Sequence, residues 1–229
     1  STLEGALIEP LAVGFHAANQ AEAGPGQTAV VLGSGCIGLV TLLALRARGV
    51  TRIIVTDVME KRLEKARELG AWQTVNSAQE GRGAGGALAH RRHGGRRDCG
   101  DGGHTGDLRQ AVELAKKGAV IVFVGYTKTG EVTLPMSLAL DKELTFKTVF
   151  RYRHIYPMAI EAVASGAINL SGIVTNFFEF DDMQNAMDRS VSDKANIVKS
   201  GHPNWRKSGG LTQGRAAADL GGTETYETG

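Results

Sequence analysis

The sequence is short of the features that mark several large classes of protein. Its 229 residues include only two cysteines, too few for a disulfide framework, which favours a reducing, cytoplasmic setting. The net charge is only +2, so composition gives no reason to expect a nucleic acid or an anionic membrane as a partner. The uncharged run at residues 29–45 is shorter than the roughly 20 residues that a membrane span needs. We therefore expect a globular protein with neither kind of partner.

A glycine-rich turn between an apolar strand and a helix is the most informative feature that is present. Residues 29–32 read as a short strand, and residues 33–38, GSGCIG, follow the G-x-G-x-x-G pattern. In such a turn the first glycine permits a tight bend, the second lets the backbone approach a pyrophosphate, and the third lets the helix pack on the strand. The helix amides then face the phosphates of a dinucleotide. The residues expected to contact this cofactor are Gly33, Gly35, Cys36, Ile37 and Gly38.

A second strand, at residues 52–56, leads to an acidic residue at the position where dinucleotide-binding folds use one. Asp57 follows Gly38 by 19 residues, close to the spacing of an acid that accepts the adenosine ribose hydroxyls. A carboxylate there repels a 2′-phosphate, so NAD is favoured over NADP. Glycines alone also occur in ordinary turns, but the complete pattern of strand, helix, strand and acid predicts a dinucleotide site.

Strands and helices alternate along most of the chain, which predicts an α/β fold with a doubly wound parallel sheet of the Rossmann type. The apolar run at residues 119–124 is typical of a strand that is buried on both faces of such a sheet. Further strands are expected at residues 73–75 and 144–150. The expected helices cover residues 8–19, begun by Pro10, then a segment that ends near Arg48, and residues 59–69, 107–115 and 155–165.

Residues 81–103 interrupt this alternation where the fourth strand of the sheet belongs. They contain nine glycines, five arginines and a single large aliphatic residue, Leu88, and show no strand pattern as written. Three interpretations compete: an Arg/Gly loop that touches nucleic acid, a metal site, or an error in the sequence. Stacking aromatic residues are absent from the segment, which speaks against nucleic acid. The metal site would use His90, His93, Cys99 and His104.

Codon degeneracy favours the third interpretation, a compensated frameshift. When the reading frame is moved by one base from Leu88 onward, the permitted residues include a glycine turn followed by Ala-Asp-Val-Ile-Val-Glu. This apolar run coincides with the place where the fold needs a strand, so we assign no function to residues 81–103 as written. The tail at residues 201–229 is polar, rich in glycine and without periodicity, and is expected to be disordered or another out-of-frame read-through.

Four segments together resemble the medium-chain, zinc-dependent alcohol dehydrogenases, and most closely their sorbitol and xylitol (polyol) branch. The segments are residues 5–13, 31–38, 143–147 and 149–152, and the likeness extends over residues 5–80 and 104–200. In that branch a Cys and a His-Glu pair in an N-terminal GroES-like domain bind the catalytic zinc. The chain lacks this domain, so the resemblance implies a fragment that begins within a longer protein.

The resemblance also divides the chain and gives individual residues a role. Residues 1–20 would form a hinge segment from a truncated catalytic domain, residues 21–166 the dinucleotide-binding domain, and residues 167–200 the return to the catalytic domain. The catalytic residues would be Glu9, beside the zinc or in its coordination shell, and Arg151 and Tyr152, on the polyol hydroxyls. Asp57 and Arg62 would bind the adenosine ribose, while Val124, Gly125, Val149 and Phe150 would approach the nicotinamide.

Simpler interpretations remain open for several of these residues. Glu9 precedes Pro10 and could act only on the dipole of a helix that starts there. Arg151 could be an ordinary surface charge, although its fork of donors suits adjacent hydroxyl oxygens. Tyr152, Phe150 and Tyr156 could equally be core or interface aromatic residues.

The resemblance implies an oxidoreductase that moves a hydride from a secondary alcohol of a polyol to NAD, giving a ketose. Zinc would polarise the hydroxyl in the full-length enzyme, which the family suggests is a tetramer. The main alternative is a non-catalytic NAD-binding module, and we expect the chain as written to be inactive because it lacks the zinc ligands. A sister dehydrogenase acting on threonine or butanediol is a further alternative, against which Phe150, Arg151 and Tyr152 speak.

Overall fold

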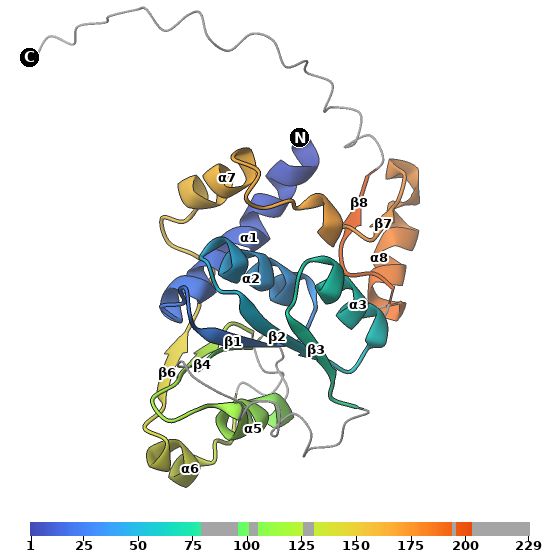
Figure 1. The fold of residues 1–229 in the computed structure, drawn as a ribbon. Helices are drawn as coiled ribbons and strands as arrows, with labels where there is room; N and C mark the ends of the chain where they lie inside the picture. The colour runs from blue at the N-terminus through green and yellow to red at the C-terminus, as the bar shows by residue number, and fades with distance from the viewer. Residues whose placement is uncertain (79–95, 101–104, 126–130, 194–195, 203–229) are drawn as a thin grey trace, which may run out of the picture.

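The computed structural model describes residues 1–78, 96–100, 105–125, 131–193 and 196–202, and its centre is a parallel sheet (Figure 1). Six strands pair in the order β3-β2-β1-β4-β5-β6, and every pairing is parallel. The order reverses between β1 and β4, as in a doubly wound sheet. This confirms the predicted fold class. The strands are β1 Thr28–Leu32, β2 Arg52–Asp57, β3 Gln73–Asn76, β4 Arg96–Gly100, β5 Val120–Phe123 and β6 Thr145–Thr148.

Strand β4 lies in the segment whose written residues show no strand pattern. Its backbone pairs Asp98 with Val30 on one side and with Ile121 on the other. The residues as written show no strand pattern, yet a strand forms where the fold needs one, because backbone amides and carbonyls between two parallel neighbours can pair whatever the side chains are. The strand stands where the shifted frame places its apolar run, and the frameshift itself stays a prediction. The proposed ligands His90, His93 and His104 lie outside the described residues.

Helices cover both faces of the sheet (Figure 1). On one face α1, α2, α3 and α7 lie over the strands, and on the other face α5 and α6 do. The short helix α6 was not expected from the sequence. The helices are α1 Thr2–Gln20, α2 Cys36–Ala47, α3 Glu60–Glu68, α5 Thr105–Leu114, α6 Met136–Asp141, α7 Tyr156–Ala164 and α8 Met183–Ser192.

Successive residues of the central strands enter two different hydrophobic cores. Val31 and Val55 pack in the core beneath α1 and α2, whereas Val30 and Ile54 pack in the core beneath α5. Because side chains alternate across a strand, a strand with both faces covered favours apolar residues at successive positions. All five residues of β1 are accordingly buried.

Helix α1 begins eight residues before Pro10, so the prediction that this proline starts the helix is wrong. Ser1 is the N-cap: its hydroxyl oxygen accepts from the Glu4 amide at 3.3 Å, and the Glu4 carboxylate accepts from the Ser1 amino group at 2.7 Å. This capping box satisfies the first backbone amides of the helix, about two turns before Pro10. The burial of Leu3 and Leu7 then holds the first turns in place although Pro10 lies inside the helix.

At Gly14, helix α1 comes close to the backbone of α2. A Cβ atom at this position would lie 2.8 Å from the Val40 carbonyl carbon and oxygen, and 2.9 Å from the Thr41 nitrogen. We expect Gly14→Ala to lower the free energy of unfolding by about 1–3 kcal/mol through overpacking. Gly5 is the matched control in the same helix, since a Cβ there has nothing within 4 Å.

Gly5→Ala should raise the free energy of unfolding by about 0.5–1 kcal/mol, the usual gain in helix propensity. Urea denaturation followed by circular dichroism measures both changes. Stabilisation by Gly14→Ala equal to that by Gly5→Ala would show that the two helices are not in backbone contact.

The segment after α7 forms a small unit beside α2 and α3 (Figure 1). Its two-stranded parallel sheet pairs Asn176 with Ser200 and Phe177 with Gly201. Gly201, the first residue of the tail predicted to be disordered, is therefore part of a strand. Residues 203–229 of that tail lie outside the described residues. Within the described ranges, no helix is long and apolar enough to cross a membrane. The unit comprises η1 Ser171–Ile173, β7 Asn176–Phe177, η2 Phe180–Asp182, α8 and β8 Ser200–Gly201.

Candidate functional site

The glycine turn joins β1 to α2 at the carboxyl end of the sheet. Gly33 has a φ of +97°, and its amide donates a hydrogen bond of 2.8 Å to the Thr56 carbonyl of the neighbouring strand. Gly38 lies so close to the turn that a Cβ atom there would be 2.0 Å from the Gly33 carbonyl oxygen. A side chain at residue 38 would therefore displace the turn itself, and Gly33 has a conformation that favours glycine.

The start of α2 faces the same turn. Gly35 is the N-cap residue and offers no side chain to cap the helix, while Cys36 and Ile37 are partly buried against the core beneath α1. The N-terminal end of a helix carries a positive partial charge, which attracts phosphate groups. The structure thus places all five glycine-turn residues predicted from the sequence around one helix terminus.

The carboxylate of Asp57 is held against this turn by three hydrogen bonds. One oxygen accepts from the Ser34 amide at 2.8 Å and from the Ser34 hydroxyl at 3.1 Å. The other oxygen accepts from the Met59 amide at 2.9 Å. Asp57 ends β2 and is partly buried, so its position is fixed by the strand, by the glycine turn and by the loop that follows β2. Arg62, the predicted second ribose ligand, lies in the first turn of α3 and is partly buried.

The predicted nicotinamide residues follow β5 and β6, on the other side of the point where the strand order reverses. Val124 and Val149 are partly buried against the core, and the Val149 amide donates to the Phe123 carbonyl at 2.8 Å. Gly125 is exposed, and the Phe150 side chain is 71% exposed. Because the carboxyl ends of parallel strands share one edge, these residues and the glycine turn lie on the same edge of the sheet.

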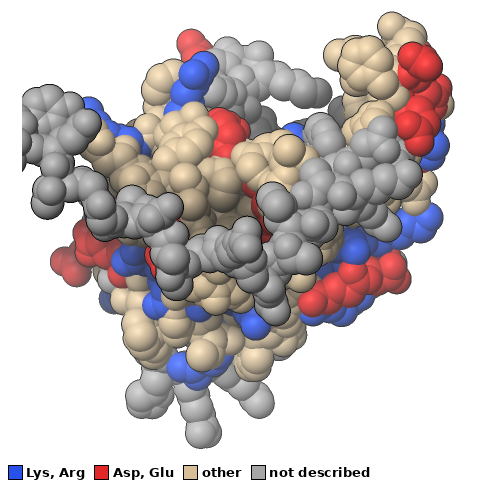
Figure 2. Space-filling view, turned by 90° about the horizontal axis from the view of Figure 1, so that it is seen from above, with Lys and Arg blue, Asp and Glu red and all other residues tan. Residues whose placement is uncertain are grey.

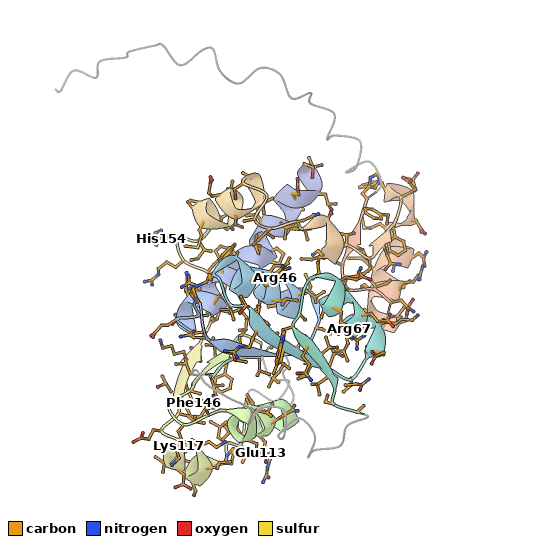
Figure 3. The ribbon with its side chains drawn as sticks, in the orientation of Figure 1. Arg46, Arg67, Glu113, Lys117, Phe146 and His154 are labelled. Atoms are coloured by element: carbon orange, nitrogen blue, oxygen red, sulfur yellow. The ribbon has the colours of Figure 1, made fainter. Side chains whose placement is uncertain are left out.

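The segment between β6 and α7 has an unusual backbone. Arg151 and His154 both have a φ of +53°, which residues with a side chain rarely adopt and which clusters at functional sites. The Arg151 guanidinium carbon lies 5.5 Å from the centre of the Phe150 ring. His154 projects from the periphery of the molecule (Figure 3). Burial, and then the charge of Arg153, lower the pKa of His16, which places this segment near α1.

Two tyrosines at the end of this segment form a pair beside Glu9. The Tyr152 and Tyr156 hydroxyl oxygens are 3.1 Å apart, and their rings meet edge to face with centroids 5.0 Å apart. The hydrogen bond to Tyr152 raises the pKa of Tyr156 to about 12, aided by burial and by the negative charges of Tyr152 and Glu9. The structure therefore places Glu9 near Tyr156, and Tyr156 in turn is bonded to Tyr152.

Glu9 lies in the middle of α1 and is exposed. The alternative that it serves the dipole at a helix start is therefore wrong, since the helix starts at Thr2. Among the described residues, no three His, Cys, Asp or Glu side chains are grouped so that they could hold a metal ion. The donor set of the described residues does not fit a zinc site, and Glu9 would be at most one contributor to such a site.

The titration of Tyr156 gives a test of the tyrosine pair. Since its pKa is raised from 10.0 to about 12, the stabilisation from this hydrogen bond should be complete below pH 10 and lost as the pH rises to 12. We expect Tyr152→Phe to return the titration of Tyr156 towards pH 10. Tyrosinate absorbance after stopped-flow pH jumps measures this before the chain unfolds. The pair would be contradicted if all tyrosines of the unaltered chain titrated together near pH 10.

The chain is similar in sequence to zinc-type dehydrogenases. A family model described as zinc-binding dehydrogenase matches residues 36–165. An Escherichia coli K12 protein described as an uncharacterized zinc-type alcohol dehydrogenase-like protein, YdjJ, is 40% identical over 198 residues, covering 86% of this chain and 56% of that protein. The sorbitol dehydrogenase of Bos taurus is 36% identical over 198 residues, covering 82% of this chain and 53% of that enzyme.

Solved structures show the same fold. The alcohol dehydrogenase rspB of E. coli CFT073, complexed with NADH, superimposes with a TM-score of 0.78 and 26% identity, over 85% of this chain and 57% of that one. The chain thus spans little more than half the length of the relatives that it matches.

Proposed function

Because the chain belongs to the family of zinc-binding dehydrogenases, we propose that it binds NAD and orients the nicotinamide ring for hydride transfer from a polyol. When NAD is bound, its nicotinamide supplies the redox chemistry by accepting the hydride. The residues of this chain would hold the pyrophosphate at the start of α2, the adenosine ribose on Asp57 and Arg62, and the nicotinamide beside β5 and β6.

The observation that carries the proposal is the pairing of the glycine turn with Asp57. The turn approaches α2 so closely that Gly38 admits no side chain, and the acid that ends β2 is bonded directly to the residue between the first two glycines. A phosphate site and a hydroxyl acceptor are thus joined rigidly, as a dinucleotide requires. A carboxylate in this position disfavours the 2′-phosphate of NADP through charge repulsion.

The polyol part of the proposal rests on Arg151, which stacks on Phe150, and on Tyr152, which is paired with Tyr156 near Glu9. Arg151 follows the strand that would flank the nicotinamide, and its guanidinium can donate to two neighbouring hydroxyls. Tyr152 adds a hydroxyl, and the sorbitol dehydrogenase relatives give the substrate class that this chemistry suits. The described residues do not hold a complete ligand set for zinc, so the part proposed for them is to bind and orient the substrate.

We propose that residues 1–20 and 167–200 connect to a catalytic domain in a longer polypeptide, and that the longer protein forms a homo-oligomer. In the view of Figure 2, residues other than Lys, Arg, Asp and Glu lie between charged residues at the edges of the face. Exposed apolar patches commonly mark interfaces. On α7 and α8 the exposed apolar side chains are Met158, Ile160, Met183, Met187 and Val191.

Titration of NADH fluorescence against the 229-residue chain, with an assay of NAD-dependent sorbitol and xylitol oxidation, tests the proposal. We expect NADH to bind and no polyol to be oxidised, because the described residues lack a zinc ligand set. Absence of NADH binding would contradict the proposed function. Robust turnover would contradict the view that the chemistry needs residues beyond this chain, and oxidation of butanediol alone would contradict the polyol assignment.

A further inference from the structure

Ser34 lies between the first two glycines of the turn, and its side chain makes a hydrogen bond to Asp57 that the glycine motif does not require. Ser34 is 0% exposed, and its hydroxyl donates to Asp57 at 3.1 Å while its amide donates to the same oxygen at 2.8 Å. Any residue except proline could supply the amide, whereas the second bond comes from the hydroxyl of the side chain. A buried hydroxyl without a partner is unfavourable, so Ser34 and Asp57 stabilise each other in this geometry.

These hydrogen bonds determine how many further donors the Asp57 carboxylate can accept. A carboxylate has about four acceptor sites, and Ser34 fills two of them on one oxygen while the Met59 amide fills one on the other oxygen. The carboxylate can therefore accept one more hydroxyl without rearrangement, on the oxygen bonded to Met59. A ribose hydroxyl can donate to that oxygen, whereas a 2′-phosphate has only acceptor oxygens at neutral pH and is repelled.

We propose that Ser34 is a specificity-determining residue that acts through Asp57, an inference that rests on the proposed NAD site. Its hydroxyl prevents the carboxylate from rotating away from an incoming 2′-phosphate, so the repulsion cannot be relieved. Without the hydroxyl, Asp57 keeps the bonds from the two backbone amides but gains freedom to turn. The chain then discriminates less between NAD and NADP.

Fluorescence titrations of NADH and NADPH against the full chain and its Ser34→Ala variant test the proposal. We expect the ratio of the NADPH Kd to the NADH Kd to fall about tenfold, the usual effect of losing a hydrogen bond to a charged group. Ser34→Thr keeps the hydroxyl and should keep the ratio. Ser165→Ala is the control, because that hydroxyl is exposed and bonds only to backbone carbonyls, at Glu161 and Ala162.

A double-mutant cycle separates this role from a general effect on stability. If Ser34 acts through Asp57, then Ser34→Ala should leave the ratio unchanged in a chain that already carries Asp57→Ala. The inference is overturned if Ser34→Ala leaves the ratio of the unaltered chain intact, or if it changes the ratio equally in both backgrounds. Failure of the unaltered chain to bind either dinucleotide would overturn the proposed function as well, so the two failures are distinguishable.

Discussion

Replacing Gly38 with alanine should abolish detectable NADH binding and lower the free energy of unfolding by about 3 kcal/mol, the upper range for overpacking. A Cβ atom at this position would lie 2.0 Å from the Gly33 carbonyl oxygen, which belongs to the backbone of the turn and cannot rotate away. The turn must move to admit the methyl group, and the start of α2 moves with it. Calorimetric titration with NADH and urea denaturation measure the two effects.

Gly24→Ala is the matched control for this substitution. Gly24 lies in the turn before β1, has nothing within 4 Å of a Cβ atom and does not have a positive φ. We expect this variant to bind NADH like the unaltered chain. If Gly38→Ala bound NADH with unchanged affinity, the close packing of the helix on the turn would not be needed for the site.

Replacing Asp57 with alanine should weaken NADH binding by about 10- to 100-fold, since hydrogen bonds to a charged group contribute about 1.5–3 kcal/mol. Binding of NADPH should not weaken, because the carboxylate opposes its 2′-phosphate. The preference between the two dinucleotides should therefore disappear or reverse. Parallel fluorescence titrations of both dinucleotides give the preference directly.

Glu60→Ala serves as the control for the loss of a nearby negative charge. Glu60 lies three residues along the chain, and its carboxylate bonds to Arg67 at 2.7 Å and to Asn76 at 3.2 Å rather than to the glycine turn. We expect Glu60→Ala to leave the preference between NADH and NADPH unchanged. An equal loss of preference in both variants would show that net charge, and not the placement of Asp57, selects the dinucleotide.

Much of the sheet could be predicted because its strands are buried on both faces. Continuous apolar runs such as residues 29–32 and 119–124 are typical of strands buried in this way, and the glycine spacing fixes how the first strand meets its helix. Strand β4 could not be found by the same reasoning, since its pairing with β1 and β5 uses backbone groups that carry no sequence signal. The short elements of the C-terminal unit were missed because two or three residues show no periodicity.

The candidate site was predictable only in part, for a related reason. Gly33, Gly38 and Asp57 follow a fixed spacing, and the structure brings them together at one strand edge. The pairing of Tyr152 with Tyr156 depends instead on backbone turns at residues with positive φ, which no pattern in the sequence indicates. The bond from the Ser34 hydroxyl to Asp57 likewise depends on the position of β2 beside the turn, which brings together residues 23 apart in the sequence.

The most direct test of the account is amide hydrogen–deuterium exchange of the 229-residue chain with and without NADH. If the dinucleotide lies across the glycine turn, exchange should slow in the peptides that contain residues 33–39 and 57–59, and remain unchanged in α6 and α8. Protection confined to segments away from the turn, with NADH bound, would contradict the placement of the cofactor on which the proposed function and the role of Ser34 depend.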